Sequence, residues 1–111
     1  MSQFLGEKTR NAILHYVPKG EVLDCLANYF QAYADRTRIK ILSALSITEL
    51  CVGDISEMLE INQTTVSHQL KFLKTFGAVA SERDGKIIYY SIKSNTINDV
   101  MLNGVNYLLQ A

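Results

Sequence analysis

The chain has 111 residues, of which 48% are hydrophobic and 20% charged, so it is long enough for one globular domain and too apolar for a disordered chain. Eleven Lys and Arg balance eleven Asp and Glu, so the net charge itself does not favour nucleic-acid binding. The two cysteines, Cys25 and Cys51, form neither a disulfide framework nor a four-cysteine zinc site. Because we find neither a signal-peptide pattern nor a membrane-spanning stretch, we expect a cytoplasmic protein with no membrane partner.

Apolar residues recur every three or four positions along most of the chain, and this spacing predicts amphipathic helices. One of these helices begins at the N-cap candidate Asp35 and carries Ile39, Leu42 and Leu45 on its apolar side. A later one begins at the N-cap candidate Asn62 and ends at the stop signal Gly77. Besides the helix that Asp35 begins, the predicted helices cover residues 3–17, 21–34, 49–59, 62–76 and 95–110.

The hydrophobic period changes after the predicted helix 62–76. Two β-prone runs, residues 78–83 and 86–92, flank the dipeptide Asp84–Gly85, which is a strong signal for a hairpin turn. We therefore predict one domain over residues 1–111, mainly α with a β-hairpin. The order of elements is that of a winged helix-turn-helix, with the helix-turn-helix at residues 52–76 and a two-stranded wing at residues 78–92.

The second helix of the predicted helix-turn-helix has two different sides. Val66, Leu70 and Leu73 lie together, whereas polar side chains such as His68 and Lys71 lie opposite them. Hydroxyl, amide and imidazole groups can meet base edges, and lysine can meet phosphate. An ordinary solvated helix face has a similar composition, and cationic hairpin tips also protect sheet edges. The predicted DNA-binding residues are Gln63, Thr64, Thr65, Ser67, His68, Lys71 and Lys74 on the helix, and Arg83 and Lys86 on the wing.

Three blocks carry a family resemblance: Ala34–Leu42, Glu49–Ile55 and Thr65–Leu73, followed by the hairpin sequence Asp84–Tyr90. With these blocks in this order, residues 22–109 resemble the ArsR/SmtB-type repressors; Arg36 departs from them, since the family often has proline there. The resemblance implies a dimeric bacterial repressor that binds double-stranded operator DNA.

Functions of two other classes are alternatives to repression. The neutral net charge favours a winged-helix module for protein–protein contact without DNA binding. An enzyme is not expected, because the sequence shows no nucleophile motif, glycine-rich phosphate loop or paired-carboxylate cluster.

The resemblance also implies which helices form the dimer, namely those at residues 3–17 and 95–110. The second of these carries Asp99 as its only charge, so it is apolar over much of its circumference and needs cover on more than one side. Core packing within one subunit is the alternative. The predicted interface residues are Ile97, Met101, Val105 and Leu108.

Family members commonly respond to metal ions, and the resemblance allows two sites to be compared. At the site on the last helix, the matching residues (Ser94, Thr96, Tyr107 and Gln110) are poor zinc ligands.

At the other site Cys51 and Asp54 match, and a partner's N-terminal arm could add His15 or Glu7 to bind zinc or another divalent metal. Gly53 stands where soft-metal sensors often have a second cysteine. Alternatively, Cys51 is simply a small buried residue, or Cys25 and Cys51 form a redox sensor.

Overall fold

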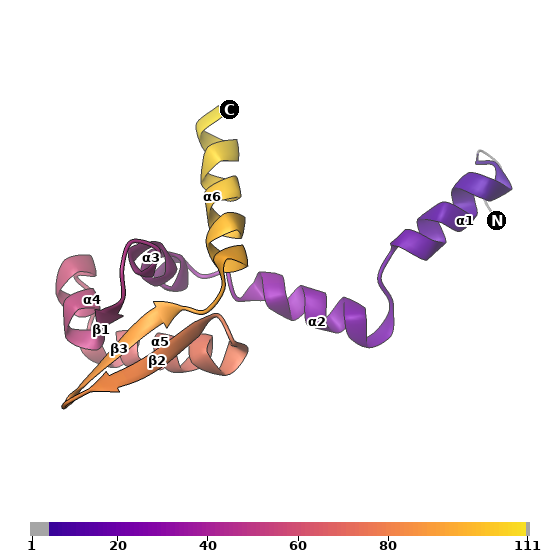
Figure 1. The fold of residues 1–111 in the computed structure, drawn as a ribbon. Helices are drawn as coiled ribbons and strands as arrows, with labels where there is room; N and C mark the ends of the chain where they lie inside the picture. Colours follow the sequence, from indigo (N-terminus) through magenta and orange to yellow (C-terminus); the bar gives the residue numbers. More distant parts are fainter. Residues whose placement is uncertain (1–4, 111) are drawn as a thin grey trace. The chain divides into compact units, whose positions relative to one another are not determined.

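The computed structural model describes residues 5–110, and the chain divides after Gln31 into two units. The first unit holds helices α1 (Glu7–Tyr16) and α2 (Gly20–Gln31). The second holds all the remaining helices and strands (Figure 1). None of the described helices is long and apolar enough to cross a membrane.

Neither helix of the first unit has a buried residue. The predicted helix over residues 3–17 begins at Glu7 as described, and residues 3 and 4 lie outside the described part of the chain. The predicted helix over residues 21–34 ends at Gln31 instead, because the next three residues turn to bring Asp35 into the extended conformation of an N-cap.

Helix α3 (Arg36–Leu45) opens the second unit. The side chain of Asp35 caps it by accepting a hydrogen bond from the backbone N–H of Arg38 at 3.0 Å, as predicted. The predicted apolar side needs one correction, since Ile39 is 42% exposed whereas Ile41 is fully buried with Leu42. The buried side of α3 is therefore formed by Ile41, Leu42 and Leu45, with Ile41 in place of the predicted Ile39.

A short strand that the sequence did not predict precedes the helix-turn-helix. Leu50 and Cys51 form β1, so the predicted helix over residues 49–59 is wrong at its start and α4 spans Val52–Leu59. The residues of β1 pair with Tyr90 and Tyr89 of β3, giving a three-stranded antiparallel sheet in the order β1-β3-β2 instead of a two-stranded wing. The physical reason is that β3 has two edges, and β2 covers only one of them.

The hairpin itself is confirmed, with strands β2 (Val79–Asp84) and β3 (Ile87–Ile92) in antiparallel register. Its turn lies one residue later than predicted, at residues 85–86, because Asp84 still pairs with Ile87. Gly85 takes a φ of +64° in this turn, and this left-handed conformation favours glycine over other residues. Gly77 plays a similar part at the end of helix α5 (Gln63–Phe76), where its φ is +96°.

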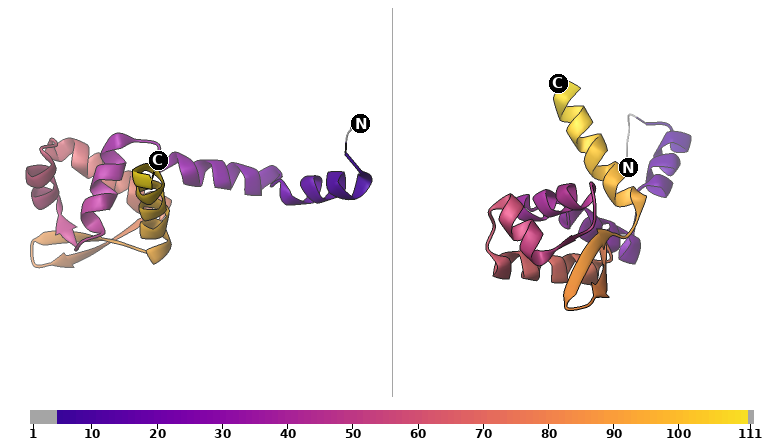
Figure 2. Two further views of the ribbon diagram at one scale, coloured as in Figure 1. Left: turned by 90° about the horizontal axis from the view of Figure 1, so that it is seen from above. Right: turned by 60° about the vertical axis from the view of Figure 1, so that its left-hand side comes forward.

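The core of the second unit lies between α3, α4, α5 and the sheet, with the start of α6 (Asn95–Gln110) closing one side. Only the early part of α6 packs against α3 and β3, and the rest of the helix extends away from them (Figures 1 and 2). The buried hydrophobic residues are Ala32, Ile41, Leu42, Leu45, Leu50, Ile55, Val66, Leu70, Leu73, Ala78, Val79 and Ile97.

The start of α5 depends on Asn62, whose side-chain oxygen accepts hydrogen bonds from the backbone N–H groups of Thr64 at 2.7 Å and Thr65 at 3.4 Å. We expect Asn62→Ala to lower the free energy of unfolding by about 1 kcal/mol, because these donors lose their acceptor. Denaturant unfolding followed by circular dichroism measures this. The control Asn62→Asp keeps an acceptor oxygen and should retain most of the stability; equal losses in both variants would contradict the capping role.

Candidate DNA-binding surface

Helices α4 and α5 form a helix-turn-helix whose two helices pack against each other through buried apolar side chains. Ile55 of α4 and Val66 of α5 are both fully buried. The turn between the helices begins at Glu60, which has a left-handed φ of +55°, and the Ser56 hydroxyl donates a hydrogen bond to the Ile61 carbonyl across it. The connection is therefore short and internally bonded, and it fixes the direction in which α5 leaves α4.

Helix α5 divides into a buried and an exposed side, as its sequence predicts. Val66, Leu70 and Leu73 are each 0% exposed, so this ridge anchors the helix in the core. The opposite side is solvent-exposed and bears hydroxyl, amide, imidazole and ammonium groups. It comprises Gln63, Thr64, Thr65, Ser67, His68 and Lys71, all of which the sequence analysis singled out.

Lys74, also predicted to meet DNA, has a different local setting. Its ammonium group donates a hydrogen bond to the Ser81 hydroxyl at 2.6 Å, which links the last turn of α5 to strand β2. Lys74 thus connects α5 to the wing.

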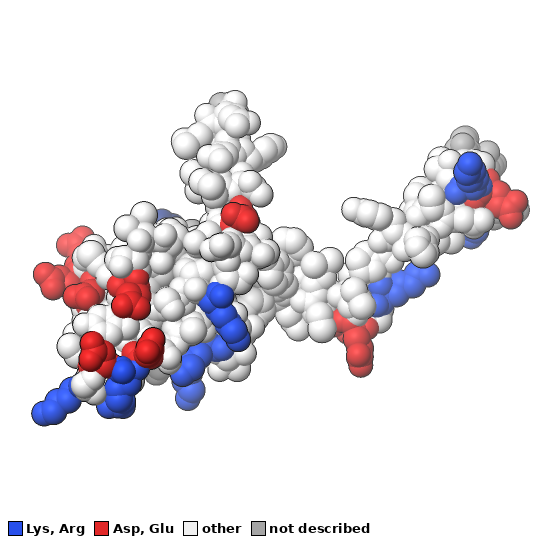
Figure 3. Space-filling view, viewed as in Figure 1, with Lys and Arg blue, Asp and Glu red and all other residues white. Residues whose placement is uncertain are grey.

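The wing carries Arg83 and Lys86 on exposed positions near and at its tip. Because side chains alternate across a strand, Arg83 lies on the opposite face of β2 from Glu82 and Asp84. Figure 3 shows Lys and Arg side chains along the lower edge of the second unit and, beside Asp and Glu, at the tip of the hairpin, while further Asp and Glu gather over α4. The zero net charge therefore conceals a separation of charge within this unit.

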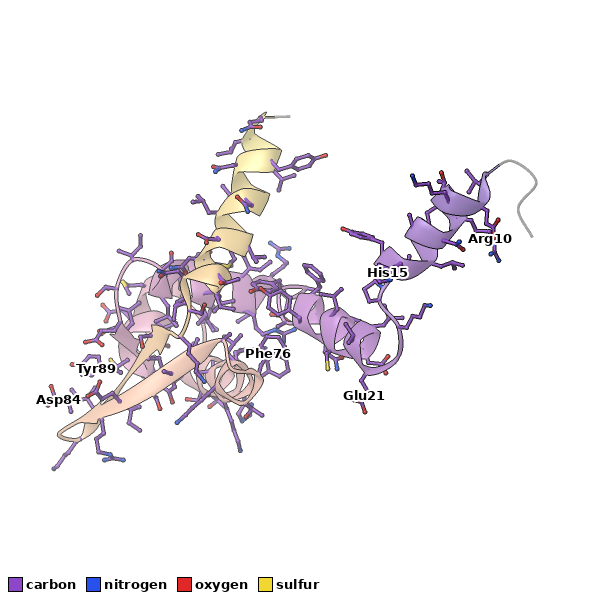
Figure 4. All side chains as sticks on the ribbon, turned by 45° about the vertical axis from the view of Figure 1, so that its right-hand side comes forward. Arg10, His15, Glu21, Phe76, Asp84 and Tyr89 are labelled. Atoms are coloured by element: carbon purple, nitrogen blue, oxygen red, sulfur yellow. The ribbon has the colours of Figure 1, made fainter. Side chains whose placement is uncertain are left out.

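The wing also carries two carboxylates, Glu82 and Asp84, on either side of Arg83 in the sequence. Three carboxylates and one arginine line a hollow here, formed by Thr48, Glu49, Glu82, Arg83, Asp84 and Tyr89. Figure 4 shows Asp84 near the wing tip and Tyr89 further back on β3. A DNA backbone would be repelled from these carboxylates, so Arg83 and Lys86 must offset them wherever the wing approaches a phosphate.

The predicted metal ligands come together only in part. The thiol of Cys51 donates a hydrogen bond to Oδ2 of Asp54 at 3.3 Å, so these two groups are adjacent. His15 lies at the end of α1, in the other unit (Figure 4). Within residues 5–110 no three His, Cys, Asp or Glu side chains form a cluster that could hold a metal ion. Cys25 is exposed on α2 and Cys51 is half-buried.

The predicted interface residues of α6 differ in exposure. Ile97 is only 6% exposed in the single chain, so it is a core residue of its own subunit and not free for a partner. Met101 is half-buried, whereas Val105 and Leu108 are 52% and 71% exposed. Leu102 and Leu109, which were not singled out as interface residues, are exposed as well.

Arg38 of α3, which was not predicted to take part in this site, supports α5 from behind the exposed side. Its guanidinium reaches Gln69 and Phe72 on the flank of α5. A signal for it was present, since Arg38 stands four residues before Leu42 and seven before Leu45, which puts a cation on the buried side of α3.

Comparison with known proteins agrees with this geometry. Residues 35–81 match the family model described as bacterial regulatory protein, arsR family. The cadmium resistance transcriptional regulatory protein CadC of Listeria innocua is 41% identical over 83 residues, which cover 74% of this chain and 70% of the relative. The transcriptional repressor SdpR of Bacillus subtilis is 38% identical, with coverages of 71% and 91%.

Solved structures give the same fold. Rv0081 of Mycobacterium tuberculosis superposes with a TM-score of 0.76 at 27% identity, covering 83% of this chain and 93% of that one. The homodimeric winged helix-turn-helix domain of Mb0332 from Mycobacterium bovis superposes with a TM-score of 0.71 at 28% identity, covering 85% and 90%. The winged helix-turn-helix prediction is confirmed, and the chain belongs to the ArsR family of bacterial regulatory proteins.

Proposed function

We propose that this protein is a homodimeric transcriptional repressor that binds double-stranded operator DNA through α5 and the wing. The observation that carries the proposal is the exposed polar side of α5, which stands opposite a fully buried ridge. A helix held this way can enter a major groove without losing its own packing. CadC and SdpR, the relatives named above, are described as a transcriptional regulator and a transcriptional repressor, and the proposal extends that role to this chain.

The chemistry of the exposed side assigns roles within this proposal. Thr64, Thr65, Ser67 and His68 carry groups that donate to or accept from base edges, so they are the proposed readers of sequence. Lys71 lies further along α5 and Arg83 on the wing, and each offers a positive charge to the phosphate backbone. A protein with zero net charge has little long-range attraction for DNA, so these local contacts must supply the affinity.

Two apolar surfaces support a dimer. The first unit has no buried residue in α1 or α2, although Leu23, Leu26 and Phe30 are apolar, so it has no core of its own. The second surface is the outer part of α6, where Val105 and Leu108 are exposed. Apolar helices of this kind gain stability when a second copy covers them, and a two-fold dimer would present two recognition helices to two half-sites.

The phosphate contacts can be tested by salt dependence. We expect Lys71→Ala and Arg83→Ala each to weaken binding to the protein's own promoter fragment roughly fivefold at low salt, because a phosphate loses its cation. The slope of log affinity against log salt should fall by about 0.9 for each phosphate that is no longer neutralised. Fluorescence anisotropy over a salt series measures both quantities.

Lys40→Ala is the matched control, because Lys40 is an exposed lysine of α3 outside the proposed surface. It should leave affinity and slope unchanged. If the wild-type protein shows no preference for its promoter over unrelated DNA at low salt, the repressor proposal fails and the protein-contact alternative gains support.

The dimer surface can be tested with a charge placed on α6. We expect Val105→Asp and Leu108→Asp to shift the protein from dimer to monomer in sedimentation measurements, because a carboxylate would be buried without a partner. Asn103→Asp adds the same charge on the opposite side of α6 and should remain dimeric. Monomeric behaviour of the wild-type protein at micromolar concentration would contradict the proposal.

We infer that a metal ion could act as effector only if a second copy added a ligand from its N-terminal arm. Cys51 and Asp54 bring together two donor groups, and zinc sites in proteins use at least three. Gly53 adjoins them, and a Cβ added there would lie 3.9 Å from the Cys51 sulfur, an ordinary contact distance. The backbone thus has room for a second thiol that this sequence lacks.

This arrangement predicts a gain of function. We expect Gly53→Cys to show a cadmium–thiolate absorption band on titration with cadmium, because two neighbouring thiolates suit a soft metal. The wild-type protein and the control Gly53→Ser should show none. A band in the wild-type protein that disappears in Cys51→Ser would instead make Cys51 a native metal ligand.

A further inference from the structure

Arg38 is a cation enclosed within the second unit. It lies in the first turn of α3, and its side chain is only 13% exposed. Arginine is seldom placed in such a position unless its donors find acceptors, because the cost of removing a charge from water is high. The contacts of Arg38 therefore indicate what it holds together.

Three segments contribute contacts to this side chain. Nε donates a hydrogen bond to the carbonyl oxygen of Ala32 at 2.9 Å, and Nη1 donates one to Oε1 of Gln69 at 3.2 Å. The guanidinium carbon lies 4.4 Å from the centre of the Phe72 ring, a cation–π distance. Oδ2 of Asp35, 3.8 Å from Nη1, balances the charge.

Two of these contacts lie on one flank of the recognition helix. Gln69 and Phe72 are three residues apart, so they occupy neighbouring positions one turn apart on α5. Lys74 lies on the other flank of the buried ridge, where its ammonium donates to the Ser81 hydroxyl at 2.6 Å. Helix α5 is thus tied on both flanks, by Arg38 to α3 and by Lys74 to β2.

We propose that Arg38 is a positioning residue that sets the rotation of α5 about its own axis, and thereby the side chains that α5 presents to DNA. The buried ridge of Val66, Leu70 and Leu73 fixes the depth of the helix and which side faces the core, but apolar contact is not directional and leaves small rotations about that position. A guanidinium hydrogen-bonded to Gln69 and stacked on Phe72 is directional.

Arginine is required for this role, and lysine cannot replace it. The planar guanidinium directs separate N–H groups at Ala32 and Gln69 while its face lies over Phe72. An ammonium group is a compact point charge that cannot satisfy all three partners from one position. Arg38→Lys keeps the charge and removes only this geometry, which makes it the informative substitution.

The inference rests on the proposed function, and its first test is binding by the full-length protein. We expect Arg38→Lys to weaken binding to the promoter fragment roughly tenfold, the equivalent of one charge-assisted hydrogen bond. Binding to unrelated DNA and the salt slope should not change, since the enclosed Arg38 contributes no phosphate contact. Arg36→Lys, at an exposed position two residues away, is the matched control and should bind as the wild type does.

A double-mutant cycle then tests the pairing with Gln69. Gln69→Ala should weaken promoter binding in the same direction as Arg38→Lys, and the double variant should be no weaker than the more affected single variant. Additive losses would show that the two residues act independently, which would overturn the proposal.

A measurement without DNA separates this inference from the repressor proposal. In ¹H–¹⁵N correlation spectra of the dimer, Arg38→Lys should shift the side-chain amide of Gln69 and the backbone signals of the exposed side of α5, whereas Arg36→Lys should not. The inference is overturned if these signals stay unchanged, or if specific and nonspecific binding fall together with the salt slope. Absence of promoter preference in the wild-type protein, with the spectral shifts present, would reject only the repressor role.

Discussion

The burial of one ridge of α5 is the constraint on which the rest of the second unit depends. Val66, Leu70 and Leu73 are completely enclosed, so α5 is held against α3, α4 and β2. Burying three such side chains contributes about 5 to 9 kcal/mol relative to exposure, which is comparable to the whole stability of a small domain. The side chains on the exposed polar side of the same helix take no part in this packing. The helix can therefore present them to a ligand.

The distribution of charged residues affects how the protein approaches DNA, which the burial of α5 does not. The chain has equal numbers of acidic and basic residues, yet cations follow the lower edge of the second unit and carboxylates gather over α4 (Figure 3). Such a molecule has little attraction for DNA at long range and must be oriented correctly to gain at short range. Orientation of α5 then matters more than total charge, which is why the directional contacts of Arg38 and Lys74 are significant.

The sequence predicted those features that depend on local order. Helical spacing located α4, α5 and α6, the cap residues Asp35 and Asn62 behave as predicted, and the β-prone runs located the hairpin. It missed features that depend on distant pairing. Strand β1 exists because Leu50 lies beside Tyr90, forty residues later, and Ile97 is enclosed because α6 returns to α3. The contact of Arg38 with Gln69 was not predicted either, because the two residues are 31 positions apart.

The two units differ in what they need for stability. The second unit closes its core within one chain, whereas α1 and α2 have no buried residue and the outer part of α6 is exposed. If a second copy covers these helices, the helix-turn-helix and the wing are already folded in each subunit before assembly. The contact between the copies then sets only the distance between the two recognition helices. Dimerisation then raises affinity by making the second half-site contact intramolecular. A signal that alters the contact between the copies would consequently change operator binding while each helix-turn-helix keeps its structure.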